Sequence, residues 1–314
     1  MKTRLCDHAM KNFSWHKLVS NYGVMPGKIA EIRKIAVGTH PLVPEGSNEA
    51  ALITSFLKDR GVDTFNSLLF NDELRQRIQT GEFDLLIALG GDGTMLRAGH
   101  LCASQGIPVL GINLGHFGFL TEIRQNNWQE HLERLLQGDY WIENRMMLWA
   151  EHWRKDERLG GWDVLNEIVV SRGRTVRPIK LDTSVDSRFL TTYVADGLIA
   201  ATPTGSTAYA LAVGGPILPP ELRVILLVPV APHLSVDRAI VLAEGSTVSI
   251  ITHTTHDAVL SVDGQPSVDL MDGDIVTARS SDHSVRFVRF QDPGYFYRNL
   301  TPHMNQNPST GNTR

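Results

Sequence analysis

Cysteines are scarce in this chain, and so are long apolar runs. Its 314 residues include two cysteines, Cys6 and Cys102. Two thiols far apart in sequence form neither a disulfide framework nor the spacing of a zinc site, so we expect a reducing, cytoplasmic location and no structural metal. The longest apolar run, 224–231, falls far short of the ~20 residues that a membrane helix requires. The sequence therefore predicts no membrane partner.

An excess of positive charge is also absent. Lys and Arg total 30 and Asp and Glu total 34, which gives a formal net charge of -4. Nucleic acids usually select a basic stripe on their protein partners, so we expect no nucleic-acid partner. A polyanionic ligand must then be held by a few local groups. Hydrophobic residues make up 42% of the chain, which suits one large or two ordinary domains with apolar cores.

The first part of the chain, 34–138, alternates short apolar runs with amphipathic stretches. The expected helices begin near Ser47, Asp72 and Gly93, and the expected strands are 34–39, 62–65, 83–89 and 107–113. Such alternation builds a parallel sheet with right-handed crossovers. We therefore expect an α/β domain over 34–138, with its ligand cleft at the carboxyl ends of the strands.

The pattern changes after Gly138. Runs rich in Val, Ile and Thr are separated there by Asp-Gly dipeptides, including Asp196-Gly197. Regularly spaced strands with Asp-Gly turns predict a mostly antiparallel β domain over 139–290. Residues 1–33 are interpreted as an N-terminal extension. We expect 291–314 to pack back on the N-terminal domain and to end in a disordered polar tail after Pro302.

Three glycines surround one carboxylate in LGGDGTML, 89–96, where an apolar run ends. No Gly-Lys-Ser/Thr follows, and Leu96 stands where a dinucleotide fingerprint has its third glycine, so neither of those loops is present. Glycines let the backbone approach a phosphate closely, and a helix N-terminus favours anions. Asp92 suits such a site if its carboxylate binds a metal ion or accepts a proton from an attacking hydroxyl. The alternative is a tight turn in which Asp92 bonds its own backbone.

Five motifs, in this order, resemble the signature set of the NAD kinase family. They are GGDGT (90–94), LGINLGHFGFLTE (110–122), LNEIVVSR (165–172), DGLIAATPTGSTAYALAVGGPIL (196–218) and SVDGQP (261–266). The resemblance extends over roughly 34–290. It implies a Rossmann-like, phosphofructokinase-like parallel sheet followed by the β-rich domain, in a homodimer or homotetramer. The implied reaction transfers a phosphoryl group from Mg-ATP, or from polyphosphate, to the 2'-hydroxyl of the adenosine ribose of NAD.

The resemblance also implies the residues that do the chemistry. Asp92 takes the position of the general base, and magnesium is held mainly by the donor phosphates, with Asp92 as a candidate ligand. The implied nucleotide contacts are Gly91, Gly93, Arg97, Phe119, Asn166, Glu167, Arg177, Asp196, Thr207, Ala208, Tyr209, Ala212 and Gln265. Asn166 and Glu167 correspond to the family's contacts with the ribose and nicotinamide side of the dinucleotide. Asp196 corresponds to the residue that accepts the nicotinamide carboxamide N–H.

Some of these positions have a plainer interpretation. Arg97 fits an exposed helix arginine, Phe119 a core aromatic, and Asp196 the turn of a hairpin. The chain also departs from the family pattern at Phe117, where leucine is usual, and at Ala212, where serine is frequent. Val194 stands where the family often has a polar residue. These departures leave the choice between NAD and NADH open.

Two other functions are compatible with parts of the pattern. A lipid or sugar kinase of the same superfamily would share GGDGT. The lipid kinases, however, carry a Gly-Thr-Gly-Asn-Asp-type element that this chain lacks. A non-catalytic NAD(H)-binding sensor would keep the fold but has no use for a base at Asp92.

Overall fold

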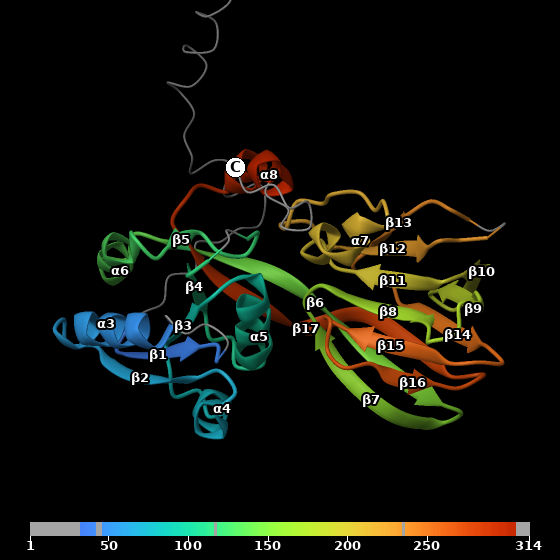
Figure 1. The fold of residues 1–314 in the computed structure, drawn as a ribbon, viewed down its shortest axis with the longest axis horizontal. Helices are drawn as coiled ribbons and strands as arrows, with labels where there is room; N and C mark the ends of the chain where they lie inside the picture. The colour runs from blue at the N-terminus through green and yellow to red at the C-terminus, as the bar shows by residue number, and fades with distance from the viewer. Residues whose placement is uncertain (1–31, 42–45, 116–117, 234–235, 306–314) are drawn as a thin grey trace, which may run out of the picture.

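The computed structural model describes residues 32–41, 46–115, 118–233 and 236–305. Figure 1 shows an α/β half and a β half that are joined by two long strands. The predicted extension up to residue 31, His116, Phe117 and the tail beyond residue 305 lie outside the described residues. Within the described ranges, no helix is long and apolar enough to cross a membrane.

The α/β half contains a parallel sheet in the order β4-β3-β1-β2. Its side chains alternate between two faces, because Ile35 and Val37 pack with α3 and α6 while Ala36 packs with α4 and α5. The elements are β1 (Lys34–Thr39), α3 (Gly46–Lys58), β2 (Asp63–Leu68), α4 (Asp72–Gln79), β3 (Leu85–Leu89), α5 (Asp92–Ala103), β4 (Val109–Asn113), β5 (Ile123–Arg124) and α6 (Trp128–Leu136). Of these, β5 and α6 were not expected from the sequence.

The β half is a sandwich of antiparallel strands around an apolar core. One layer has the order β13-β12-β11-β8-β15-β16, and the other contains β10, β9, β14, β17, β6 and β7. The elements are β6 (Trp141–Arg154), β7 (Glu157–Val164), β8 (Glu167–Arg172), β9 (Ile179–Val185), β10 (Arg188–Ala195), β11 (Gly197–Ala201), η2 (Gly205–Thr207), α7 (Tyr209–Ala212), β12 (Val224–Val230), β13 (Ile240–Ala243), β14 (Val248–His253), β15 (Ala258–Val262), β16 (Val268–Leu270) and β17 (Ile275–Arg289). The last described element is helix α8 (Tyr295–Asn305).

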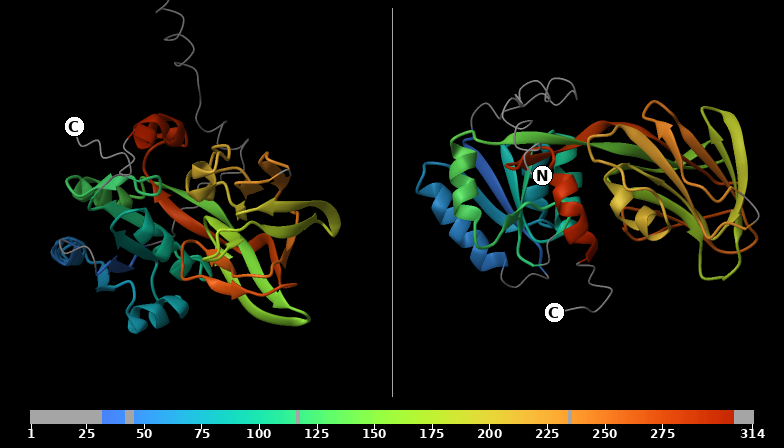
Figure 2. Two further views of the ribbon diagram at one scale, coloured as in Figure 1. Left: turned by 45° about the vertical axis from the view of Figure 1, so that its right-hand side comes forward. Right: turned by 90° about the horizontal axis from the view of Figure 1, so that it is seen from above.

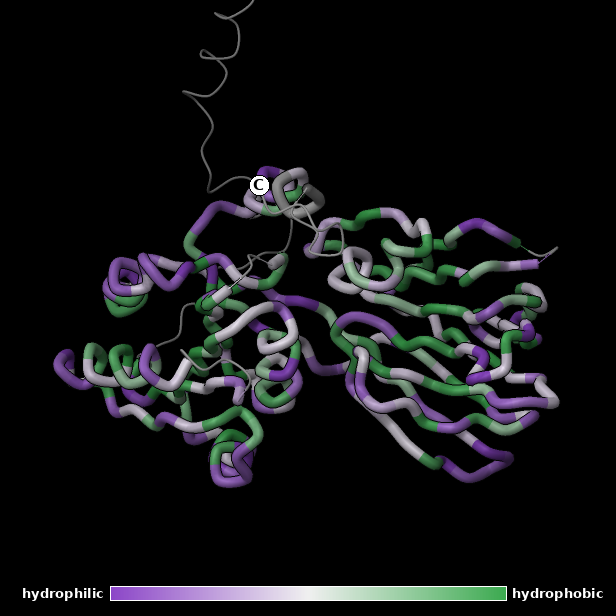
Figure 3. Tube along the Cα trace, viewed as in Figure 1, coloured by the Kyte–Doolittle hydropathy of each residue, from purple (hydrophilic) through white to green (hydrophobic). Residues whose placement is uncertain are grey.

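Strands β6 and β17 connect the two halves into one sheet. They pair with each other from Ile275↔Trp153 to Arg289↔Trp141, and β17 also pairs with β4 at Phe287↔Val109. Seen from above in Figure 2, both strands span the junction, and α8 lies beside it. In Figure 3 hydrophobic residues are concentrated in the strands of both halves. The predicted fold class, a parallel α/β sheet with a mostly antiparallel β part, is confirmed, while the domain boundaries at residues 33, 138 and 290 stay predictions.

Two local predictions were wrong. The Asp196-Gly197 dipeptide does not form a hairpin, because β10 belongs to one layer of the sandwich and β11 to the other. A dipeptide shows that the chain turns but not which sheet it joins next. The polar tail was expected after Pro302, yet its first three residues, 303–305, belong to α8, and the rest of the tail lies outside the described residues.

The change of layer at Gly197 provides a test of the packing between β8 and β11. A Cβ at this position would lie 2.7 Å from the backbone oxygen of Val170, which has no freedom to move aside. We expect Gly197→Ala to lower the free energy of unfolding by about 1–3 kcal/mol and to lower Tm by several degrees in a thermal melt. Gly245→Ala is the matched control, because open space surrounds that glycine. An equal Tm for both variants would contradict the packing described here.

Candidate active site

The glycine-rich turn holds the carboxylate of Asp92 at the start of helix α5. Gly90 follows β3 with φ of 149°, and a Cβ there would overlap Thr94, so this position requires glycine. Asp92 is the first residue of α5, where the helix dipole favours a negative charge. Its Oδ2 accepts the N–H of Phe119 at 2.8 Å, and its Oδ1 accepts the N–H of Leu120 at 3.0 Å. The carboxylate is therefore fixed by a neighbouring loop rather than by its own turn.

That loop is folded by Asn113, which is buried at the carboxyl end of β4. The Asn113 side chain accepts the N–H of Gly115 at 2.6 Å and donates to Thr121 Oγ1 at 3.0 Å. Gly118 lies directly against Asp92, and a Cβ at this position would overlap the carboxylate. The absence of a side chain at Gly118 thus permits the two N–H groups that follow to reach Asp92.

A pocket of about 250 Å³ opens beside Asp92 at the junction of the two halves. Four regions of the chain line it: the start of α5 with the loop after β4, strand β6, the segments before β8 and after β11, and helix α8. The lining residues are Asp92, Gly93, Leu96, Phe119, Leu120, Arg145, Asn166, Pro203, Thr204, Thr207, Ala208 and Phe296. Asp92, Gly93, Phe119, Asn166, Thr207 and Ala208, all singled out in the sequence, come together in this "Asp92 pocket".

The segment that carries Asn166 is held by Asp263, whose role the sequence did not reveal. The buried Asp263 carboxylate accepts the backbone N–H groups of Leu165, Asn166 and Glu167 at 2.7, 2.8 and 2.9 Å. It also lies 2.6 Å from Nε2 of His100 on α5. Asp263 therefore ties the helix that begins at Asp92 to the start of β8. The SVDGQP motif was the available signal, but there only Gln265 was singled out, which is exposed and outside the pocket.

Glu167 lies behind Asn166 and is only 7% exposed. Burial, together with the nearby charge of Asp263, raises the pKa of Glu167 to about 8, although the N–H of Tyr209 opposes the shift. One of its carboxyl oxygens, Oε2, has no hydrogen-bond partner within the described residues. Burial therefore favours the protonated, neutral form of Glu167.

Other predicted residues do not line the Asp92 pocket. The Arg97 guanidinium carbon lies 4.6 Å from the centroid of the Phe70 ring. The Asp196 carboxylate forms an ion pair with Arg172, with 2.9 Å between Oδ1 and Nε. Asp196 precedes β11 at the end opposite to Ala201, roughly 16 Å along the strand.

Gly91 is the N-cap of α5. The remaining positions outside the pocket are exposed: Arg177, Tyr209, Ala212 and Gln265. Ligand contacts for all of these residues stay predictions.

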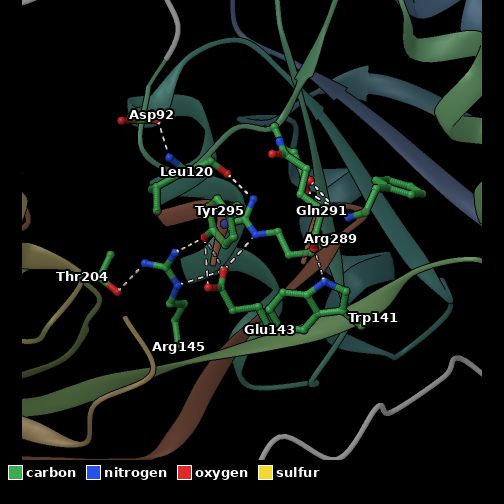
Figure 4. A network of polar contacts seen from close by, with 11 residues as sticks. Asp92, Leu120, Trp141, Glu143, Arg145, Thr204, Arg289, Gln291 and Tyr295 are labelled. Atoms are coloured by element: carbon green, nitrogen blue, oxygen red, sulfur yellow. Dashed lines mark hydrogen bonds and ion pairs between the residues drawn. The ribbon is translucent and has the colours of Figure 1, made fainter. Parts of the chain in front are cut away.

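Beneath the pocket lies a buried charge cluster formed by Glu143, Arg145, Arg289 and Tyr295 (Figure 4). Glu143 accepts from Arg289 Nε at 2.8 Å and lies 3.0 Å from Arg145 Nε. Burial opposes its charge, but the two guanidinium groups outweigh that effect and lower the pKa of Glu143 to about 2. The sequence did not identify this cluster, since nothing local marks a strand arginine as buried.

The described residues contain no group of three His, Cys, Asp or Glu side chains arranged to hold a metal ion. Asp92 is the sole carboxylate among the residues that line the pocket, and Arg145 is the sole cation. A larger, open hollow of about 970 Å³ lies elsewhere in the β half, but none of the residues predicted from the sequence lines it. The chemistry of the protein is therefore best sought in the Asp92 pocket.

Two family models match this chain. The ATP-NAD kinase N-terminal domain matches residues 6–140, and the ATP-NAD kinase C-terminal domain matches residues 165–290. The NAD kinase of Chloroflexus aggregans is 40% identical over 270 residues, which cover 86% of this chain and 97% of that protein. The NAD kinase of Heliobacterium modesticaldum is 42% identical over 225 residues, covering 71% of this chain and 79% of that protein.

Solved structures give a consistent picture. Yeast NADH kinase, crystallised with NADH, superposes with a TM-score of 0.79 at 25% identity, over 90% of this chain and 92% of that chain. An NAD kinase from Archaeoglobus fulgidus, in complex with ATP, superposes with a TM-score of 0.71 at 27% identity, over 87% of this chain and 98% of that chain.

The raised pKa of Glu167 predicts a pH-dependent stability. The folded state keeps this proton up to about pH 8, whereas the unfolded chain loses it near 4.5, so stability falls as pH rises between these values. Gln does not ionise, so Glu167→Gln should become more stable than the wild type over this window, by up to about 1.4 kcal/mol per pH unit. Urea titrations from pH 5 to 9 measure the difference. The exposed Glu221→Gln is the control, and a pH-independent difference for Glu167→Gln would show that Glu167 is ionised in the folded state.

Proposed function

Because the chain belongs to the NAD kinase family, we propose that it transfers the terminal phosphoryl group of ATP to the 2'-hydroxyl of the adenosine ribose of NAD. A bond forms between the ribose oxygen and phosphorus, the bond to ADP breaks, and the hydroxyl proton passes to Asp92. The observation that carries this proposal is the fixed carboxylate of Asp92, which lies at a helix N-terminus on the wall of a small pocket.

The arrangement of Asp92 suits a general base. Each carboxylate oxygen accepts one backbone N–H, from Phe119 and Leu120, which leaves lone pairs for a substrate hydroxyl. The two N–H donors keep the carboxylate in one orientation before the substrate arrives. Phosphoryl transfer needs little covalent help from the protein, so such positioning supplies much of the rate acceleration.

A divalent cation fits this pocket as a companion of the donor phosphates. Mg²⁺ prefers oxygen ligands and retains several waters, and Asp92 is the one carboxylate that the pocket offers. We therefore assign the metal mainly to the donor phosphates, with Asp92 as its protein ligand. When bound, it neutralises charge on the transferred group.

The acceptor is proposed to occupy the walls formed by Asn166, Thr207 and Ala208, with Glu167 behind them. Amide and hydroxyl groups both donate and accept hydrogen bonds, which suits a polyhydroxy ligand. The contacts outside the pocket remain part of the proposal: Gly91, Arg97, Arg177, Asp196, Tyr209, Ala212 and Gln265. We also propose a cytoplasmic homodimer or homotetramer, as the family resemblance implies.

The alternative functions find less support. A lipid kinase would leave the polar groups of Asn166, Thr204 and Thr207, which lie among apolar residues on the walls of this pocket, without a ligand to bond. A sensor that only binds NAD(H) has no need of an acid held by two N–H groups.

Replacement of Asp92 tests the base directly. In Asp92→Asn the amide retains one acceptor oxygen but cannot take the hydroxyl proton, so kcat should fall by about 10²–10⁴-fold. The dissociation constant of NAD, measured by calorimetry, should change little. The matched control is Asp72→Asn, because Asp72 is also the first residue of a helix but is exposed and remote from the pocket. Wild-type turnover in Asp92→Asn would exclude the proposed base.

The donor and the metal can be tested in one assay. We expect NADP to appear when NAD and Mg-ATP are added and to disappear when EDTA removes the metal. An NADP-specific dehydrogenase measures the product. Parallel reactions with polyphosphate identify the donor, and reactions with NADH, read as NADPH by chromatography, identify the preferred acceptor. If every combination leaves the acceptor unchanged, the kinase proposal is wrong.

A further inference from the structure

The charge cluster contacts both walls of the Asp92 pocket. On one side, Arg289 donates to the backbone oxygen of Leu120 at 2.8 Å, and Leu120 is one of the two residues whose N–H groups hold Asp92. On the other side, Arg145 donates to Thr204 Oγ1 at 3.3 Å. Figure 4 shows the continuous path from Asp92 to Thr204 through these groups.

Tyr295 completes this path. Its hydroxyl accepts from Arg145 Nη2 at 2.7 Å and donates to the Glu143 carboxylate, whose oxygens lie at 3.0 and 3.1 Å. A phenol both donates and accepts, so it can join a cation to an anion, which neither a phenylalanine nor a carboxylate can do. Burial raises the pKa of Tyr295 to about 12, so the hydroxyl keeps its proton at neutral pH.

The sequence around Tyr295 fixes its place. Helix α8 begins six residues after Arg289, at Tyr295. The preceding turn is held by Asp292, which accepts the N–H of Gly294 at 2.9 Å and also accepts from Arg298. The next residue of the helix, Phe296, is buried and lines the Asp92 pocket. Helix α8 therefore contributes both a wall of the pocket and the group that holds Arg145.

From these contacts, and on the basis of the proposed kinase activity, we propose that Tyr295 is a positioning residue for the phosphoryl transfer. It adds a second connection between Arg145 and Glu143 beside their direct ion pair, and the cluster in turn keeps the loop that holds Asp92 at a fixed distance from the Thr204 segment. Tyr295 does not touch the substrate. Its contribution is to the alignment of Asp92 with the acceptor bound against the opposite wall.

The variant Tyr295→Phe isolates the hydroxyl. It keeps the ring, whose centroid lies 5.1 Å from the Arg289 guanidinium, so the packing of α8 is retained. We expect kcat to fall about 3- to 10-fold, because the hydrogen bonds of the hydroxyl to Arg145 and Glu143 are lost and part of that loss reaches the transition state, while KM for NAD and ATP changes less than twofold. Tyr297→Phe is the matched control, because this tyrosine lies on the same helix and is 57% exposed.

A double-mutant cycle separates positioning from general stability. If Tyr295 acts through Asp92, then Tyr295→Phe should change the residual turnover of Asp92→Asn less than twofold. An equal fall in both backgrounds, or a wild-type kcat in Tyr295→Phe, would overturn the proposal. Thermal melts confirm that each variant is folded at the assay temperature. Should Tyr295→Phe not fold, Thr204→Val removes another acceptor of Arg145 and enters the same cycle. A wild-type protein that makes no NADP would instead refute the kinase activity.

Discussion

The two hydrogen bonds from Phe119 and Leu120 to Asp92 determine the geometry of the pocket. They join the end of β3 to the loop after β4, two neighbouring strands of the parallel sheet. A carboxylate at a helix N-terminus would otherwise point into solvent with several rotamers available. Held by two donors, it presents its remaining lone pairs in one direction, at the edge of the sheet where the strands end.

The opposite wall of the pocket belongs to the β half, so its distance from Asp92 depends on how the halves are joined. Strands β6 and β17 pair with each other along nearly their whole length, and β17 also pairs with β4. Although its register shifts between Ser280 and Ser284, this paired ladder resists hinge motion better than a linker would, because bending it breaks backbone hydrogen bonds. The His100–Asp263 contact adds a second connection, from α5 to the start of β8. We infer that the pocket is largely preformed.

The sequence predicted those parts of the site whose signal is local. Glycines beside an acid at the end of an apolar run were enough to locate Asp92, and the motifs around Asn166 and Thr207 located the facing wall. Asp263 was not assigned, because its bonds to Leu165, Asn166 and Glu167 join segments far apart in sequence. Arg145 was missed for a different reason, since an arginine within a strand looks like a residue of the solvent face. The sheet change at Asp196 was missed because a dipeptide cannot indicate which sheet the chain joins next.

The distribution of buried charge has a physical rationale. Carboxylates such as Glu49 and Asp274 are also buried within the halves, but the two buried arginines of the described residues, Arg145 and Arg289, lie with Glu143 between the halves, beside the pocket. Burying an ion costs several kcal/mol, and apolar replacements of buried ion pairs are often as stable. Stability alone therefore does not account for charges at this junction. Apolar contacts tolerate sliding, but a guanidinium and a carboxylate require particular distances and directions. The cluster thus makes the separation of the pocket walls specific where an apolar junction would leave it variable.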